Sequence, residues 1–108
     1  MPVRGIRRRY LAFTIEPNEK VEEKEIWEVI RSSIQTLYGI KGISLIDPNL
    51  IKYDPVNHRG LVRCTHDTER YMRCALAYIT SIKGGAIAVR VWRTSGTIKK
   101  LRNKANEY

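Results

Sequence analysis

The sequence contains only two cysteines and one phenylalanine among its 108 residues, and it has no long apolar run. Its apolar runs, such as residues 87–89, are far shorter than the roughly 20 residues of a transmembrane helix, so we expect no membrane span. Residues 1–9 are basic, but no apolar stretch follows them that would serve as a signal peptide. These absences predict a cytoplasmic protein, in which two cysteines give little reason to expect a disulfide.

Sequence patterns that carry catalysis are also missing. The chain has neither the glycine-rich phosphate loop G-x-x-x-x-G-K nor the zinc motif H-E-x-x-H. Cys64, His66 and Cys74 lack the spacing of a tetrahedral zinc site, and we interpret both cysteines as small buried hydrophobic residues. We therefore expect no catalytic residue, no metal site and no bound cofactor in this chain.

The two histidines have simpler interpretations than catalysis. His66, Asp67 and Glu69 lie where a predicted strand gives way to a helix. Asp67 is expected to cap that helix and Glu69 to face its dipole, rather than to form an acid–base cluster with the histidine. His58 falls in a predicted turn, where it fits a solvated loop residue as well as an RNA contact. Neither histidine predicts an active site.

Positive charge dominates the rest of the sequence. Twenty Lys and Arg residues against eleven Asp and Glu residues give a formal net charge of +9. Residues 16–28 contain six of the acids and two lysines, a net charge of −4, which leaves +13 on the remainder. Both ends of the chain are basic, the electrostatic pattern of a polyanion-binding domain. Because no strongly amphipathic basic helix stands out, nucleic acid is favoured over a membrane surface as the partner.

Alternation and helical periodicity predict four strands and two helices in one domain, residues 1–108. The expected strands are residues 7–16, 43–53, 60–65 and 86–94, and the expected helices are residues 19–38 and 67–83. The order β-α-β-β-α-β with right-handed crossovers gives an α+β, ferredoxin-like (RRM-like) sandwich. Its four-stranded antiparallel sheet has two helices on one face, the first and third strands are central, and the fourth flanks the first. A short basic C-terminal tail or helix follows from Thr97.

The apolar residues of each predicted helix form one stripe that should face the sheet. In the first helix the stripe is Ile26, Val29, Ile30, Ser33, Ile34 and Leu37. In the second helix it is Tyr71, Ala75, Tyr78, Ile79 and Ile82. Gly39 is the expected C-cap of the first helix.

The predicted topology brings basic segments from both ends of the sequence together. The candidate RNA-binding residues are Arg7, Arg8, Arg9, Arg90, Arg93, Lys99, Lys100 and Arg102. The arginines at 7–9 are expected beside those of the fourth strand, so that one continuous basic strip binds phosphates without reading the bases.

Aromatic residues on the sheet have two possible uses. The side away from the helices should carry Tyr10, Thr14, Leu61, Arg63, Arg90 and Trp92. The third strand lacks the aromatic residues on which a standard RNA-recognition motif stacks bases, so stacking on Tyr10 is the less favoured interpretation. Tyr10 and Trp92 are instead candidate protein-interface residues.

Three segments resemble the protein component 2 family of archaeal ribonuclease P, which has a counterpart in eukaryotic ribonuclease P and ribonuclease MRP. The first is RRRYLAF at residues 7–13. The second is GLVRC at residues 60–64, followed by a helix with Tyr71 and Arg73. The third is VRVWRTSGTIKK at residues 89–100. The similarity covers essentially the whole chain.

The resemblance implies an RNA-binding subunit of ribonuclease P, the endoribonuclease (a hydrolase) that removes the 5′ leader of precursor tRNA. It implies pairing with protein component 3, a barrel-shaped protein, and self-association within a heterotetramer of two copies of each. Catalysis would belong to the ribonuclease P RNA and its Mg²⁺ ions. Arg90, Lys99 and Lys100 would lie in the family's basic surface, and no catalytic residue carries over.

Two other classes of function remain as alternatives. One is another RNA-binding module of the same fold, such as a ribosomal or RNA-modification accessory protein, which would act on unrelated RNA without component 3. The other is a small-molecule regulatory domain or enzyme of ferredoxin-like fold. It would require a ligand pocket, and it would leave the positive charge outside the acidic window without a role.

Overall fold

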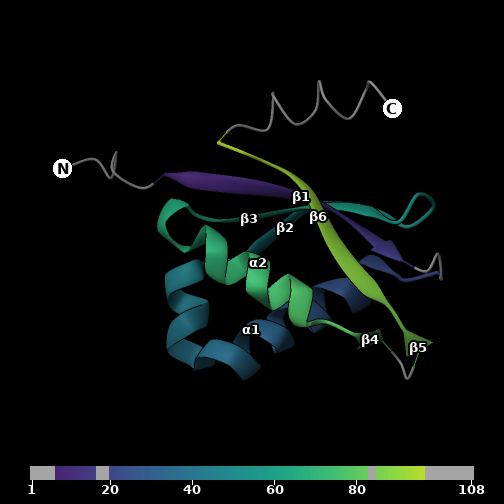
Figure 1. The fold of residues 1–108 in the computed structure, drawn as a ribbon, viewed down its shortest axis with the longest axis horizontal. Helices are drawn as coiled ribbons and strands as arrows, with labels where there is room; N and C mark the ends of the chain where they lie inside the picture. The colour runs from purple at the N-terminus through teal and green to yellow at the C-terminus, as the bar shows by residue number, and fades with distance from the viewer. Residues whose placement is uncertain (1–6, 17–19, 83–84, 97–108) are drawn as a thin grey trace.

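The structure is a four-stranded antiparallel sheet covered on one face by two helices (Figure 1). The computed structural model describes residues 7–16, 20–82 and 85–96. Its elements are β1 (Arg8–Glu16), α1 (Glu23–Ile46), β2 (Asn49–Asp54), β3 (Arg59–Thr65), the short 3-10 helix η1 (His66–Thr68), α2 (Glu69–Tyr78), β4 (Ser81–Ile82), β5 (Gly85–Ala86) and β6 (Ala88–Ser95). The strand order β2-β3-β1-β6 confirms the ferredoxin-like prediction, with β1 and β3 central and β6 beside β1. The basic tail predicted from Thr97 lies outside the described residues.

The side chains of strand β1 alternate between the buried face of the sheet and the opposite face. Its residues Leu11, Phe13 and Ile15 are at most 1% exposed and face the helices. On β3, Val62 and Cys64 are fully buried on the same side. The helices supply the opposite wall of the core through Ile26, Ile30, Ile34, Ile46, Met72, Ala75 and Leu76. Each large apolar side chain buried in this way contributes about 1.5–3 kcal/mol to stability.

Gly60 of β3 allows the ring of Phe13 to lie directly against the backbone. The two residues pair across the strands, and a Cβ atom at Gly60 would lie 2.3 Å from Cζ of the ring. That distance is shorter than atoms tolerate, so this strand position requires glycine for space. The largest fully buried side chain in the core is therefore accommodated by the absence of a side chain on the neighbouring strand.

The later part of the acidic window, residues 23–28, forms the start of α1. Glu23 and Glu25 lie in the first turn, where the positive end of the helix dipole favours them. The Glu25 carboxylate also accepts a hydrogen bond from the backbone N–H of Glu22 at 2.9 Å, which satisfies one free donor at the helix end. The predicted apolar stripe of this helix is buried or partly buried except for Leu37, which is 38% exposed.

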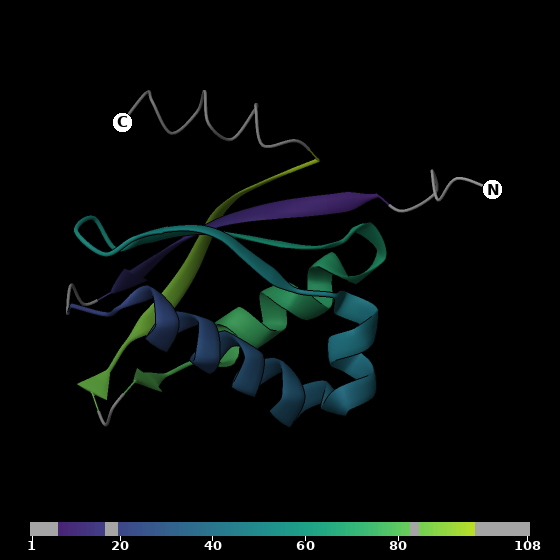
Figure 2. The ribbon, with the colours of Figure 1, turned by 180° about the vertical axis from the view of Figure 1, so that it is seen from behind.

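The predicted helix end at Gly39 is a break in α1, but the helix resumes after it. Gly39 has φ 75° and ψ −175°, a conformation that favours glycine, and α1 changes direction there (Figure 2). Residues 43–46, predicted as strand, are helical, so that prediction is wrong. A four-residue segment with three apolar residues fits either period, and here Ile43 and Ile46 pack on one core at helical spacing. Asp47, with φ 49°, ends the helix and donates its N–H to the carbonyl of Ile43 at 2.8 Å.

Helix α2 is shorter than predicted because the chain leaves it to form a small hairpin. The predicted helix extends to Lys83, whereas α2 ends at Tyr78 and β4 pairs with β5. The segment after α2 is rich in β-branched residues, which disfavour a helix. Its two isoleucines, Ile79 and Ile82, are nevertheless buried as predicted.

The buried face of α2 differs from the predicted one. Tyr71 and Tyr78, expected to face inward, are 41% and 52% exposed. The residues of α2 buried in the core are Met72, Ala75 and Leu76. The two helices approach closely at this face, since the Ser33 hydroxyl of α1 donates to the carbonyl of Ala75 at 2.6 Å. The close contact between α1 and α2 has room for small and aliphatic side chains, and the two tyrosines lie at the edge of this contact.

The two cysteines have different environments. Cys64 is fully buried, as predicted, and burial raises the pKa of its thiol to about 11. Cys74 is exposed, so the prediction of burial is wrong there. It lies on α2 beside the buried stripe rather than in it.

We expect iodoacetamide at pH 8 to modify Cys74 quickly and Cys64 only after unfolding. Cys64 offers neither access nor an appreciable thiolate population, because its pKa is about 11. Peptide mapping by mass spectrometry after a short exposure should locate the label at residue 74. Equal labelling of both thiols in the folded chain would contradict the burial of Cys64.

Gly60→Ala should lower the free energy of unfolding by about 1–3 kcal/mol, the usual cost of overpacking a core. Gly96→Ala is the matched control, because the nearest atom to its added Cβ would be Nη1 of Arg9 at 3.8 Å. Urea unfolding of both variants measures the difference. Equal losses of stability would show that Phe13 does not depend on the space at Gly60.

Candidate nucleic-acid interface

The sheet face turned away from the helices, which we call the open face, carries rows of side chains that pair across the strands. The first row is Asp54, Arg59, Thr14 and Arg90. The second row is Lys52, Leu61, Ala12 and Arg93. The third row is Asn49, Arg63, Tyr10 and Ser95, and Arg8 lies beyond it opposite Thr65. Cationic side chains thus surround a small apolar centre.

A β-bulge in β6 places two arginines that are three residues apart on the same face. Arg90 pairs with Thr14 and Arg93 pairs with Ala12, and the register shifts between these two pairs. In a regular strand, residues three positions apart face opposite sides. Trp92 is the additional residue of the bulge, which restores both arginines to the open face.

Two arginines of the open face have acidic partners at its margins. Nη1 of Arg8 contacts Oδ2 of Asp47, and Nη2 of Arg90 lies 3.6 Å from Oε1 of Glu16. The Arg90 side chain is 69% exposed, so this pair contributes little to stability. Six lysine and arginine side chains lie on the open face among the described residues, against these two partners and one acid in the first row. The face is therefore positive overall.

The predicted continuous strip is wrong in two respects. Strand β6 lies beside β1 and antiparallel to it, both as expected, so the first residues of β6 face the end of β1 and not its start. Arg90 is consequently opposite Thr14, six residues along β1 from Arg8, or about 20 Å at 3.3 Å per residue. Alternation also separates the arginines at positions 7–9. Arg8 is on the open face, whereas Arg9 contacts Glu69 of α2 on the helix side.

Tyr10 and Trp92 occupy different positions on this face. Tyr10 is half-buried between Arg63 on β3 and Ser95 on β6. Nε of Arg63 is completely covered, so that side chain lies along the sheet rather than extending into solvent. Trp92 is partly buried at the bulge. Their role in a protein interface stays a prediction, as does base stacking on Tyr10.

Sequence reasoning left three cations of the open face out of the RNA-binding set. They are Lys52, Arg59 and Arg63. The arginines could have been found, because they alternate with buried residues of β3. Lys52 could not, because the bulge that orients it has no sequence signal. Lys99, Lys100 and Arg102 lie outside the described residues.

The turn between β2 and β3 is shaped by Asp54. Its carboxylate accepts hydrogen bonds from Nδ2 of Asn57 at 2.7 Å and from the backbone N–H of Val56 at 2.9 Å. These hydrogen bonds lower the pKa of Asp54. His58 ends the turn with φ 57°, and its carbonyl accepts the N–H of Ile15 at 3.0 Å. His58 is only 8% exposed, so the interpretation as a solvated loop residue is wrong.

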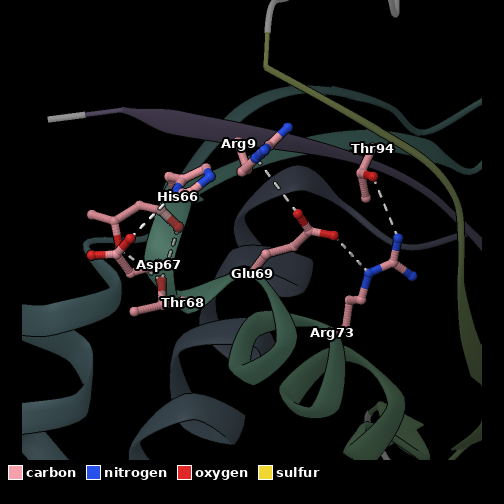
Figure 3. Close-up of polar contacts among 8 residues, drawn as sticks. Arg9, His66, Asp67, Thr68, Glu69, Arg73 and Thr94 are labelled. Carbon is pink, nitrogen blue, oxygen red and sulfur yellow. Dashed lines mark hydrogen bonds and ion pairs between the residues drawn. The ribbon is translucent and has the colours of Figure 1, made fainter.

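The junction between β3 and α2 begins with a 3-10 turn, which shifts the helix start past Asp67. Thr68 is the N-cap residue of α2, so the prediction that Asp67 caps this helix is wrong. The Asp67 side chain is 93% exposed, and its Oδ1 lies 3.1 Å from Nδ1 of His66 (Figure 3). Glu69 does lie in the first turn of α2, as predicted.

Residues 7–16, 20–82 and 85–96 contain neither a cluster of metal ligands nor a membrane-spanning helix. No group of three or more His, Cys, Asp or Glu residues in these ranges is arranged to hold a metal ion. No helix in the same ranges is long and apolar enough to cross a membrane.

Known proteins resemble this chain over most of its length. The sequence model of the Rpp14/Pop5 family matches residues 9–106. Ribonuclease P protein component 2 of Pyrococcus horikoshii is 35% identical over 98 residues, which are 91% of this chain and 82% of that protein. The protein of the same name from Methanococcus aeolicus is 36% identical over 98 residues, which are 91% of this chain and 71% of that protein.

A chain in the cryo-EM structure of yeast ribonuclease MRP has the same fold. The TM-score is 0.71, and the match covers 94% of this chain and 92% of that chain at 12% identity. At this identity the likeness concerns the fold alone. The family match, however, spans the main sheet and both helices, and the archaeal relatives align over the same region. This chain therefore belongs to the Rpp14/Pop5 family.

Proposed function

We propose that this chain is the RNA-binding protein component 2 of ribonuclease P, the ribonucleoprotein that removes the 5′ leader of precursor tRNA. The observation that carries the proposal is the family match over residues 9–106. Relatives that bear this component's name share 35% and 36% identity with the chain. The positive open face supports the same conclusion, because closely spaced lysine and arginine side chains bind the phosphates of RNA.

The open face favours binding to the RNA backbone over reading of the bases. Arginine and lysine contacts to phosphates fix the position of a protein on RNA without selecting sequence. Tyr10 is the one aromatic residue on β1 and β3 that faces this side among the described residues. A single ring does not form the paired stacking platform of an RNA-recognition motif. The proposed role is thus to stabilise the folded catalytic RNA.

We assign the chemistry to the RNA and not to this chain. In the proposed holoenzyme the ribonuclease P RNA and its Mg²⁺ ions carry out the endonucleolytic hydrolysis. This subunit supports the catalytic domain of the RNA together with protein component 3, in a heterotetramer with two copies of each. We further propose that the assembly acts in the cytoplasm and that Trp92 and Tyr10 contribute to its protein contacts.

The purified chain alone should not cleave precursor tRNA at any Mg²⁺ concentration, whereas its addition with component 3 to ribonuclease P RNA should lower the Mg²⁺ needed for cleavage. The subunit's cations replace part of the metal charge that the folded RNA requires. Single-turnover assays that omit each component in turn measure this. Cleavage by the RNA-free chain, or no effect of its omission, would refute the proposal.

Replacing Arg90 and Arg93 together by alanine should weaken binding to ribonuclease P RNA and flatten its salt dependence. Each lost phosphate contact reduces the log–log slope by about 0.7–0.9, so two contacts give up to about two units. Arg31→Ala is the matched control, because Arg31 lies on α1, over Trp27, on the helix side. Fluorescence anisotropy across a salt titration measures both variants.

The paired change of Lys99 and Lys100 to alanine should act in the same way if the basic surface continues into residues 97–108. Tyr10→Ala distinguishes the stacking alternative, because it removes no charge. A large loss of affinity in Tyr10→Ala, with an unchanged salt slope in the arginine and lysine variants, would contradict binding through phosphates.

A further inference from the structure

A second basic cluster lies on the helix side of the sheet, where the start of β1 meets the start of α2. Arg9 has the same strand parity as Leu11 and therefore points toward the helices. Its Nε lies 3.7 Å from Oε1 of Glu69 on α2. Nε of Arg73, one turn further along α2, donates to Oε2 of the same carboxylate at 3.1 Å. Figure 3 shows this carboxylate between the two guanidinium groups.

Thr94 of β6 completes the arrangement. Nη2 of Arg73 donates to Oγ1 of Thr94 at 3.4 Å, so Arg73 spans from α2 to the edge strand of the sheet (Figure 3). The contacts come from three elements that are distant in sequence. Arg73 is thereby bonded to both α2 and β6, whereas Arg9 is oriented by its ion pair with Glu69. Side chains that are positioned in advance lose less conformational freedom when a ligand binds.

The cluster carries more positive charge than a structural ion pair requires. One carboxylate faces two guanidinium groups, which leaves a net charge of +1 among these three side chains. Their side chains are 29–45% exposed, so the cluster is open to solvent. Glu69 and Thr94 each accept one hydrogen bond from Arg73, whereas the 3.7 Å between Glu69 and Nε of Arg9 is an ion pair beyond hydrogen-bond length. A guanidinium group has five N–H donors, so several donors of this pair have no acceptor among the described residues.

Gly96, which follows the end of β6, lies beside the guanidinium group of Arg9. A Cβ placed at Gly96 would be 3.8 Å from Nη1 of Arg9, an ordinary van der Waals contact. The Arg9 side chain is 35% exposed, so its guanidinium group is partly open to solvent.

We propose that Arg9 and Arg73, positioned by the shared carboxylate of Glu69, form a second phosphate-binding site for the RNA backbone, separate from the open face. The proposal rests on the proposed function and names two binding residues for it. Planar guanidinium groups bind phosphate oxygens through paired N–H donors. Glu69 is a positioning residue, because its carboxylate repels phosphate and acts only through the two arginines.

The test measures binding of fluorescently labelled ribonuclease P RNA across a salt titration. Arg73→Ala should weaken binding on the order of tenfold at low salt, as expected for a charged hydrogen-bonding group. It should also lower the log–log slope by about 0.7–0.9. Arg73→Lys should keep the slope and lose part of the affinity. Arg70→Ala, which removes an exposed charge stacked over Tyr71 on the same helix, should have a smaller effect than Arg73→Ala.

The Glu69→Gln variant distinguishes a phosphate-binding role of the cluster from a purely structural role. If the cluster binds phosphate, this variant removes a repelling charge, and RNA affinity should stay the same or rise. If the cluster only fastens α2 to the sheet, Glu69→Gln and Arg73→Ala should lower the melting temperature equally and neither should change the salt slope more than Arg70→Ala. That second result would overturn the proposal. Absence of RNA binding by the unmodified chain would instead refute the proposed function.

Discussion

The structure depends on the strict alternation of one central strand. Because Leu11, Phe13 and Ile15 of β1 are buried against the helices, every intervening residue must lie on the other side of the sheet. The neighbouring strands β3 and β6 pair with β1 in a fixed register, so their side chains are assigned to the same two faces. Burial therefore decides which arginines gather on the open face and which reach the helices, although none of the arginines belongs to the core.

The cationic side chains form two groups with different surroundings. Those on the open face surround Leu61 and Ala12, and all six extend from strands. Arg9 and Arg73 are held between a strand and a helix by a carboxylate and a threonine. Both groups are suited to phosphates rather than to bases, since neither surrounds a pair of stacking rings. The acids at the start of α1 stabilise a helix end on the opposite layer, away from the open face.

The sequence was sufficient to predict the strand order, the central strands and most of the open face, because these follow from period-two burial and short connections. The sequence was insufficient where a segment fitted two local structures equally well and tertiary contacts determined which one formed. Residues 43–46 fit a strand or a helix equally, and the core selected the helix. The bulge at Trp92 and the choice of the α2 face that is buried, which leaves Tyr71 exposed, likewise depend on neighbouring elements. The pairing of Arg9 with Glu69 required both the parity of β1 and the true start of α2.

The position of β6 beside β1 also has a consequence for how the domain is made. These strands are the first and last described, so their pairing closes a long loop, a step that slows folding. During synthesis, one hydrogen-bonding edge of β1 stays unpaired until β6 has been made. The strand that pairs with this edge also carries Arg90 and Arg93. A chain interrupted before β6 would therefore expose this edge to aggregation, and it would also lack the two arginines that β6 contributes to the open face.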